Sequence, residues 1–156
     1  MIALALSCMP ELLIADEPTT ALDVTIQAQI LQLIKELKDK TDTSVILITH
    51  NMGVIAEVAD NVLVMYCGRV LEYSDVRSLF KSPKHPYTIG LLNSIPKIEG
   101  VKNKLYTIKG CVPIPGQITE GCRFKTRCDY VTSRCLTEEP PLFDSEKSLV
   151  RCWKYK

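Results

Sequence analysis

The stretch LLIADEP, residues 12–18, decides the fold class of this chain. Its apolar residues stop abruptly at Asp16 and Glu17, as they do in a parallel strand that is covered on both faces. Asp23 follows and can cap a helix, because apolar residues recur at helical spacing after it: Ile26, Ile30, Leu33, Ile34 and Leu37. This part of the sequence therefore predicts a strand, an acidic turn and an amphipathic helix.

Two further apolar runs follow, residues 44–49 and 62–66, and a short helix is predicted between them around residues 54–58. Strands that alternate with helices indicate an α/β fold with a parallel sheet. In such sheets ligands bind at the carboxyl ends of the strands. The acidic pair and His50 both stand at ends of this kind.

Regular patterns weaken in the second half of the chain. Gly68 marks a turn, and short helices are predicted around residues 75–80 and 87–94. Beyond them the periodicity fades, and four prolines indicate a loop-rich appendix: Pro113, Pro115, Pro140 and Pro141. We therefore expect two domains, residues 1–80 and 81–156.

The composition excludes several classes of protein. No apolar run approaches the roughly 18 residues that a membrane span needs, and the start lacks the basic segment of a secretory signal. Residues 1–80 contain 5 Lys and Arg against 11 Asp and Glu, whereas residues 81–156 contain 14 against 7. The basic residues are scattered without regularly spaced aromatic residues between them, so we expect no nucleic-acid partner. A cytoplasmic protein is predicted.

Cysteines are crowded near the end of the chain. Of the 7 cysteines, Cys8 and Cys67 lie in the first half and the others in the last 46 residues: Cys111, Cys122, Cys128, Cys135 and Cys152. In a chain without a secretory signal such crowding favours a metal site over disulfides.

The acidic pair has the chemistry that nucleotide hydrolysis requires. Mg²⁺ prefers oxygen ligands, so Asp16 is placed for a metal. The adjacent Glu17 can polarise an attacking water, since phosphoryl transfer needs mainly positioning and charge stabilisation. Taken alone, these residues are equally consistent with a strand that meets solvent through acidic side chains, and His50 with a surface histidine.

Three segments taken together indicate a resemblance to a known family. LLIADEP at residues 12–18, ALD at 21–23 and LITH at 47–50 together resemble the Walker B, D-loop and switch-histidine series of ABC ATPases. The resemblance implies the C-terminal part of a RecA-like P-loop ATPase core, with parallel strands and flanking helices, that uses ATP and Mg²⁺.

The resemblance also implies roles for individual residues. Asp16 would hold Mg²⁺ through water, Glu17 would be the catalytic carboxylate, and His50 would sense the γ-phosphate. Asp23 would lie in the loop that crosses to a partner ATPase subunit. The Walker A loop, the Q-loop and the signature loop of such ATPases do not occur in the sequence. We therefore expect Met1 to be an internal methionine of a longer protein, and the chain alone to be inactive.

The appendix, residues 81–156, indicates which group of ABC ATPases the chain resembles. SPKHPYT at residues 82–88, LLNSIP at 91–96, GCVP at 110–113 and GCRF at 121–124 resemble the C-terminal region of oligopeptide and dipeptide (peptide/nickel) importer ATPases. This implies a peripheral subunit at the cytoplasmic face of the cell membrane that energises import of peptides or similar solutes. Its partners would be a second ATPase subunit, transmembrane permease subunits and, indirectly, an external solute-binding protein. The cargo stays open between peptide, nickel and another solute.

Four of the late cysteines form a candidate ligand set. Cys122, Cys128, Cys135 and Cys152 have long, irregular spacings, unlike the close pairs of most zinc modules. Four thiolates suit a 4Fe-4S cluster, which several of the resembling proteins carry here. Zinc, or free structural cysteines, are the alternatives. We expect the other three cysteines to be bystanders or small buried hydrophobic residues.

Two other functions stay open. The chain could be an autonomous four-cysteine metal-cluster module with a vestigial acidic pair. It could also belong to a non-transport ABC ATPase of DNA repair or translation, although the appendix and the absence of coiled-coil heptads before residue 12 speak against this class.

Overall fold

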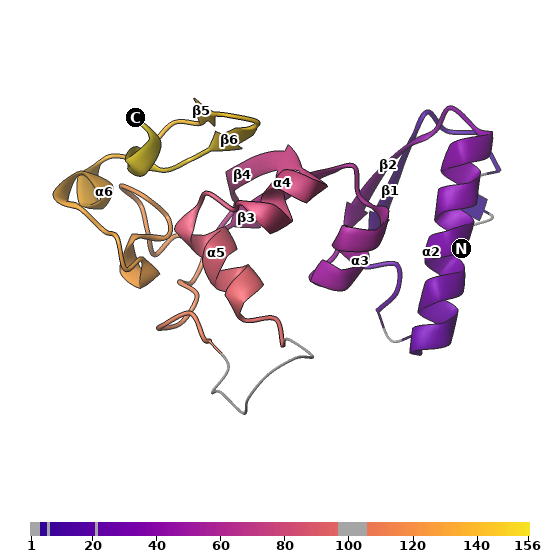
Figure 1. The fold of residues 1–156 in the computed structure, drawn as a ribbon, viewed down its shortest axis with the longest axis horizontal. Helices are drawn as coiled ribbons and strands as arrows, with labels where there is room; N and C mark the ends of the chain where they lie inside the picture. Colours follow the sequence, from indigo (N-terminus) through magenta and orange to yellow (C-terminus); the bar gives the residue numbers. More distant parts are fainter. Residues whose placement is uncertain (1–3, 6, 21, 97–105) are drawn as a thin grey trace. The chain divides into compact units, whose positions relative to one another are not determined.

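The computed structural model describes residues 4–5, 7–20, 22–96 and 106–156 (Figure 1). The chain divides into two compact units, residues 1–58 and 59–156. The fold combines a parallel strand pair with a separate antiparallel sheet, so it is a mixed α/β structure.

The N-terminal unit is built on two parallel strands, β1 (Leu12–Asp16) and β2 (Ser44–Ile48). Their register pairs the first residue of β1 with the first of β2 and the last with the last. The carboxyl ends of both strands therefore lie at one edge, as the sequence predicts. The helix α3 (Met52–Val58) follows β2.

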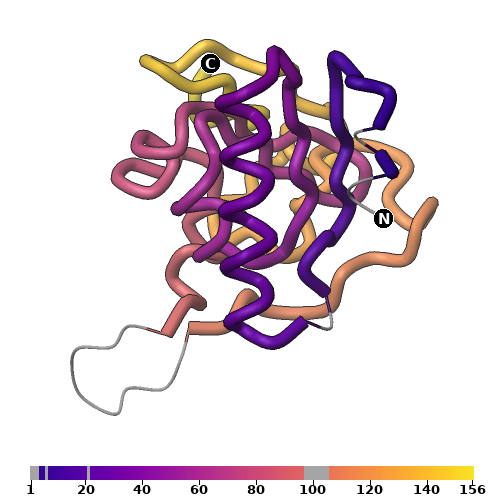
Figure 2. The backbone as a smooth tube through the Cα atoms, turned by 90° about the vertical axis from the view of Figure 1, so that its right-hand side faces the viewer, coloured from indigo at the N-terminus to yellow at the C-terminus, as the bar shows by residue number. Residues whose placement is uncertain are grey.

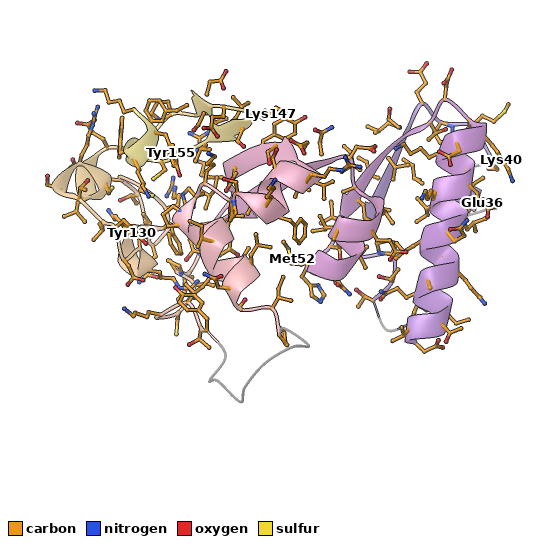
Figure 3. All side chains as sticks on the ribbon, viewed as in Figure 1. Glu36, Lys40, Met52, Tyr130, Lys147 and Tyr155 are labelled. Carbon is orange, nitrogen blue, oxygen red and sulfur yellow. The ribbon has the colours of Figure 1, made fainter. Side chains whose placement is uncertain are left out.

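The helix α2 (Val24–Lys40) joins the two strands and lies alongside them in both Figure 1 and Figure 2. Asp23 caps it as predicted, because its Oδ1 accepts a hydrogen bond of 2.9 Å from the backbone N–H of Ile26. On its exposed side Glu36 and Lys40, both labelled in Figure 3, pair at 3.7 Å. Such a pair contributes about 0.2–0.5 kcal/mol to the helix.

One face of the strand pair is not covered by the described residues. Leu12, Ile14, Ile46 and Ile48 alternate along the two strands and remain between 47 and 60% exposed. The expectation of strands covered on both faces is therefore not met within the described residues, because these supply a second layer on one side alone.

The second unit begins with an antiparallel hairpin, β3 (Asn61–Tyr66) and β4 (Arg69–Asp75). Its two turn residues, Cys67 and Gly68, have φ of 45° and 74°, which suits the tight turns that match the twist of a hairpin. The expectation that residues 62–66 add a third parallel strand was wrong. A two-residue turn pairs β3 with β4, and within the described residues no pairing joins β3 to β1 or β2.

Two short strands near the end of the chain complete this sheet. β5 (Phe143–Ser145) and β6 (Ser148–Val150) form a second hairpin, and the strand order is β3-β4-β6-β5. Val150 of β6 faces Glu72 of β4 in the register and is fully buried. The sheet thus joins residues from both sides of the predicted boundary at residue 80, and the division into domains 1–80 and 81–156 stays a prediction.

Short helices and loops form the rest of this unit, as predicted for a loop-rich appendix. The described elements are α4 (Val76–Lys81), α5 (Pro86–Asn93), η1 (Lys125–Arg127), α6 (Ser133–Thr137) and η2 (Trp153–Tyr155). The core forms where the first hairpin meets the cysteine-bearing loops, through Tyr66, Leu71, Cys122 and Phe124. None of the helices in the described ranges combines the length and apolar character needed to cross a bilayer.

Candidate functional site

Glu17 lies directly beyond the end of β1. Its backbone N–H donates a hydrogen bond of 2.8 Å to the carbonyl of Ile48, which extends the parallel pairing by one residue. Its φ is 43°, a left-handed conformation that is uncommon outside glycine and asparagine. His50 stands two residues beyond β2, so the structure brings the two predicted residues to one edge of the sheet.

The side chains of Glu17 and His50 are in direct contact. Nδ1 of His50 lies 2.9 Å from Oε1 of Glu17, so this nitrogen carries a proton and donates it to the carboxylate. The contact lowers the pKa of Glu17 below its ordinary value, and a second hydrogen bond from Thr20 adds to this effect. The carboxylate is therefore ionised at neutral pH.

Thr20 is a member of this site that the sequence analysis missed. Its hydroxyl donates a hydrogen bond of 2.8 Å to Oε2 of Glu17, while its backbone N–H donates to the Glu17 carbonyl at 3.1 Å. Both carboxylate oxygens are thus engaged. The available signal was the tight Pro-Thr-Thr turn after the acidic pair, in which a hydroxyl three residues on can reach back.

The other two predicted residues have separate positions. Asp16 is exposed at the end of β1, beside Glu17 in the chain. Asp23 uses its carboxylate to cap α2. The exposed carboxylates of Asp16 and Glu17, at the carboxyl end of β1, form a donor set that fits Mg²⁺. This ion takes one or two carboxylates together with phosphate and water oxygens.

The four predicted cysteine ligands share one cavity of about 460 Å³ in the second unit. They come from separate segments: Cys122 and Cys128 flank η1, Cys135 lies in α6, and Cys152 precedes η2. Aromatic and basic side chains line the same cavity, among them Phe124, Tyr130, Trp153, Lys125, Arg134 and Lys154. Tyr130 and Tyr155 are labelled in this part of the chain in Figure 3.

Backbone contacts hold the first cysteine loop against α6. Cys122 N–H donates a hydrogen bond of 2.9 Å to the carbonyl of Cys135. The Lys125 ammonium group donates to the carbonyls of Glu120 and Leu136 at 2.9 and 2.8 Å. At Gly121 the φ is +68°, and a Cβ would lie 2.5 Å from the carbonyl oxygens of Cys135 and Leu136, so glycine is required there.

The cavity disfavours thiolate charge in the absence of a cation. Burial raises the pKa of Cys122 to about 11, and burial likewise raises the pKa of Cys128 and Cys152. Neighbouring thiols add to the shift at Cys122. Among the described residues no set of three or more His, Cys, Asp or Glu side chains is close enough to hold a single metal ion. The four thiols surround a space rather than converge on one point.

The remaining cysteines stand apart from the cavity lining. Cys8, Cys67 and Cys111 are all exposed. The interpretation of these three as bystanders is consistent with this position, whereas the expectation that they are small buried hydrophobic residues was wrong, because each lies in a turn or loop at the surface.

Sequence reasoning also missed the buried position of His85 at the cysteine cavity. This residue is almost completely buried, and its ring lines the cysteine cavity. Burial lowers its pKa to about 4, so the ring is neutral at pH 7. The only sequence signal was the His-Pro-Tyr string at residues 85–87, which contributes to the family resemblance but does not by itself predict a buried histidine.

Two family models match parts of this chain. A family model described as "Oligopeptide/dipeptide transporter, C-terminal region" matches residues 71–135, and a model described as an AAA domain matches residues 1–56. The first match covers most of β4, all of α4 and α5, and three of the four cavity cysteines. The second covers the parallel strand pair.

Individual relatives align with nearly the whole chain. The oligopeptide transport ATP-binding protein AppD of Bacillus subtilis is 56% identical over 157 residues, covering 100% of this chain and 48% of the relative. OppD of Salmonella typhimurium is 48% identical, covering 99% and 46%. The dipeptide transport ATP-binding protein DppD of Escherichia coli is 49% identical, covering 91% and 43%. The chain thus spans about half the length of the curated relatives it matches.

In class, the chain is thus similar to part of an ATP-binding protein of the ABC type. More narrowly, nearly the whole chain is similar to about half the length of ATP-binding proteins of oligopeptide and dipeptide transporters, and residues 71–135 match the model of that family's C-terminal region.

Proposed function

We propose that this chain is the C-terminal part of an ATP-hydrolysing subunit that energises import of peptides or similar small solutes through a membrane permease. The observation that carries the proposal is the 2.9 Å contact between Glu17 and His50 at the carboxyl edge of the parallel strands. The relatives are named oligopeptide and dipeptide transport ATP-binding proteins, which supports the same function.

In this proposal Glu17 is the catalytic carboxylate. Ionised and exposed, it can accept a hydrogen bond from an attacking water and orient that water. His50 holds one of its oxygens from the next strand and would sense the γ-phosphate of ATP. Thr20 holds the other oxygen, so the carboxylate has a defined direction before substrate binds.

The remaining residues of the edge complete the proposed site within a RecA-like core. Asp16 would hold Mg²⁺ through water, and this ion neutralises charge on the phosphates when it is bound. Asp23 would lie in the loop that crosses to a second ABC ATPase subunit. Further partners would be the transmembrane permeases and, indirectly, an external solute-binding protein, with the subunit at the cytoplasmic face of the membrane.

The cysteine cavity suits a 4Fe-4S cluster as a second bound group. Cys122, Cys128, Cys135 and Cys152 would hold it, and four thiols around a shared space suit a cluster of several metal atoms better than one zinc ion. When bound, such a cluster supplies positive charge that stabilises the thiolates. The nearby Lys125, Arg134 and Lys154 would offset the remaining negative charge.

The hydrolytic roles are tested in the complete subunit. Glu17→Gln should retain ATP but stop turnover, because binding does not require the carboxylate, and His50→Ala should slow turnover similarly. Glu36→Gln, an exposed carboxylate on α2 of the same unit, is the matched control and should hydrolyse ATP at the parental rate. Parental turnover in both the Glu17 and His50 variants would refute the assignment.

The metal site is tested on this chain purified without air. It should be brown, with broad absorption near about 400 nm from thiolate-bound iron. Replacing any one of the four cavity cysteines by Ser should bleach it, whereas Cys111→Ser should not, because that thiol lies outside the cavity. Stoichiometric zinc in a colourless protein would instead indicate a structural zinc site, and anaerobic protein without metal would refute both.

A further inference from the structure

Two segments far apart in the chain contribute cysteines to the cavity and meet at one aromatic ring. The guanidinium carbon of Arg134 lies 3.5 Å from the centroid of the Trp153 indole ring. Arg134 directly precedes Cys135 in α6, and Trp153 directly follows Cys152. A cation over an aromatic face is attracted electrostatically, and tryptophan attracts it most strongly. The stack of Arg134 on Trp153 therefore joins the chain neighbours of two cavity cysteines.

The residue after α6 holds the same indole ring at its nitrogen. Nε1 of Trp153 donates a hydrogen bond of 3.1 Å to the backbone carbonyl of Glu138. The carboxylate of Glu138 accepts a hydrogen bond of 2.7 Å from Nε of Arg134, which limits the directions that the guanidinium group can take. The indole is thus in contact with α6 and its end at two points, through interactions of two kinds.

A second cation and ring join the two segments. Nζ of Lys154 lies 5.2 Å from the centroid of the Tyr130 ring. Here the C-terminal segment supplies the cation and the cysteine loop supplies the ring, the reverse of the pair formed by Arg134 and Trp153. All four side chains line the cysteine cavity. The contacts between the segments are therefore part of the cavity wall.

Further contacts attach the C-terminal segment to the rest of the unit. β6 ends at Val150 and pairs with β4. Nη1 of Arg151 donates a hydrogen bond of 3.0 Å to the carbonyl of Pro140, and the hydroxyl of Tyr155 donates one of 2.9 Å to the carbonyl of Lys84. Loss of the Arg134 stack should therefore loosen residues 152–154 locally and leave the sheet intact.

We propose that Arg134 is a positioning residue of the cysteine cavity: by stacking on Trp153 it holds Cys152 at the wall that it shares with Cys135. The geometric part of this proposal stands on the chain alone. Its consequence for metal binding rests on the proposed cluster site. Arg134 is not a ligand in this proposal, because a guanidinium group has donors and no acceptor.

Three variants separate the stack from the ion pair. Arg134→Gln removes both. Arg134→Lys keeps a cation that can lie over the ring, without the planar guanidinium group. Glu138→Gln is the matched control: it removes the carboxylate but keeps Arg134 and the backbone carbonyl that accepts from Trp153. The side chains of the ion pair are 39 and 56% exposed, and pairs at such positions contribute little.

The readout is the rate at which iodoacetamide alkylates each cysteine of the reduced, chelator-treated chain, followed by peptide mass spectrometry. Loss of one cation–π contact should make Cys152 react about twofold to about thirtyfold faster in Arg134→Gln. Removing a cation disfavours the reactive thiolate and by itself would slow the reaction, so a faster rate reports local opening. Arg134→Lys should recover most of the parental rate, and Glu138→Gln should react at that rate. Exposed Cys111 should react equally in all four proteins.

A Cys152 rate in Arg134→Gln that is unchanged or slower would overturn the proposal. An equal acceleration at buried Cys122 would do so too, because the whole unit would then have loosened. An equal acceleration in Glu138→Gln would assign the effect to the ion pair and not to the stack.

A second arm measures iron in the chain purified without air. Arg134→Gln should retain less iron than the parent, and Arg134→Lys should recover most of it. Equal iron in the parent and Arg134→Gln would overturn the consequence for metal binding. If the parent contains no iron, the proposed cluster site fails, while the alkylation rates still decide the role of Arg134.

Discussion

Replacing Gly121 by alanine should destabilise the second unit and open the cysteine cavity. The new Cβ would lie 2.5 Å from two backbone carbonyl oxygens, those of Cys135 and Leu136, which cannot turn away as a flexible side chain could. Overpacking of this kind costs about 1–3 kcal/mol. The left-handed backbone, with φ of +68°, adds about 1–2 kcal/mol for any residue with a Cβ. The expected total is about 2–5 kcal/mol.

Gly116→Ala is the matched control for this substitution. Its φ is +85°, yet a Cβ there would meet no atom within 4 Å, so it carries the backbone cost without the clash. The chain has 1 tryptophan, Trp153, which lines the cavity, so its fluorescence during urea or thermal unfolding reports on this unit. One kcal/mol shifts the melting temperature of a domain of this size by about 4–8 °C. Gly121→Ala should therefore melt roughly 10 °C below Gly116→Ala, and equal melting of the two would refute the close contact.

Three further predictions concern other parts of the molecule. Because burial lowers the pKa of His85 from 6.5 to about 4, its contribution to the stability of the metal-free chain should be complete above pH 6.5 and be lost as the pH falls to about 4. The loss in the free energy of unfolding should be about 3 kcal/mol. Urea unfolding at a series of pH values should show a weaker pH dependence for His85→Asn than for the parent, and equal pH dependence would contradict the prediction. Glu72→Gln should lower the free energy of unfolding, measured in urea, by about 1–3 kcal/mol. Both oxygens of Glu72 accept hydrogen bonds from backbone N–H groups, and glutamine would put a second donor in front of one of these groups. An unchanged urea midpoint would count against this role of Glu72. Ile14→Lys should raise the solubility of the chain, since Ile14 is 60% exposed on the uncovered sheet face. The unfolding transition followed by Trp153 fluorescence should not change. Light scattering equal to that of the parent would contradict this prediction.

The strand-end site was largely predictable because it depends on neighbours in the chain. Asp16 and Glu17 end one apolar run and His50 follows another, and parallel pairing brings the ends of both runs to one edge. The cap at Asp23 was equally local, since a carboxylate three residues before the helical N–H groups can reach them. Thr20 was missed because a turn can direct a hydroxyl in several ways, and only the folded chain selects one.

The pairing direction of β3 could not be predicted from local sequence patterns. An apolar run is compatible with parallel or antiparallel pairing, and the choice was made by the two-residue turn at Cys67 and Gly68. The strands at residues 143–145 and 148–150 are three residues each, too short to show an alternating pattern. The pairing of the second of them, β6, with β4 is a contact between distant parts of the chain.

The sequence alone therefore determined the helices α2 to α5, the ends of the two parallel strands, the family resemblance and the identity of the four cysteines that line one cavity. The tertiary structure alone decided how that cavity is assembled: Glu72 accepts hydrogen bonds from the backbone of residues 84 and 85, and the ring of His85 packs against Phe124. The physical reason is that a periodic pattern records the environment of a residue within its own helix or strand. A hydrogen bond between residues far apart in the chain leaves no such pattern, and it forms only once the backbone has brought the two groups together.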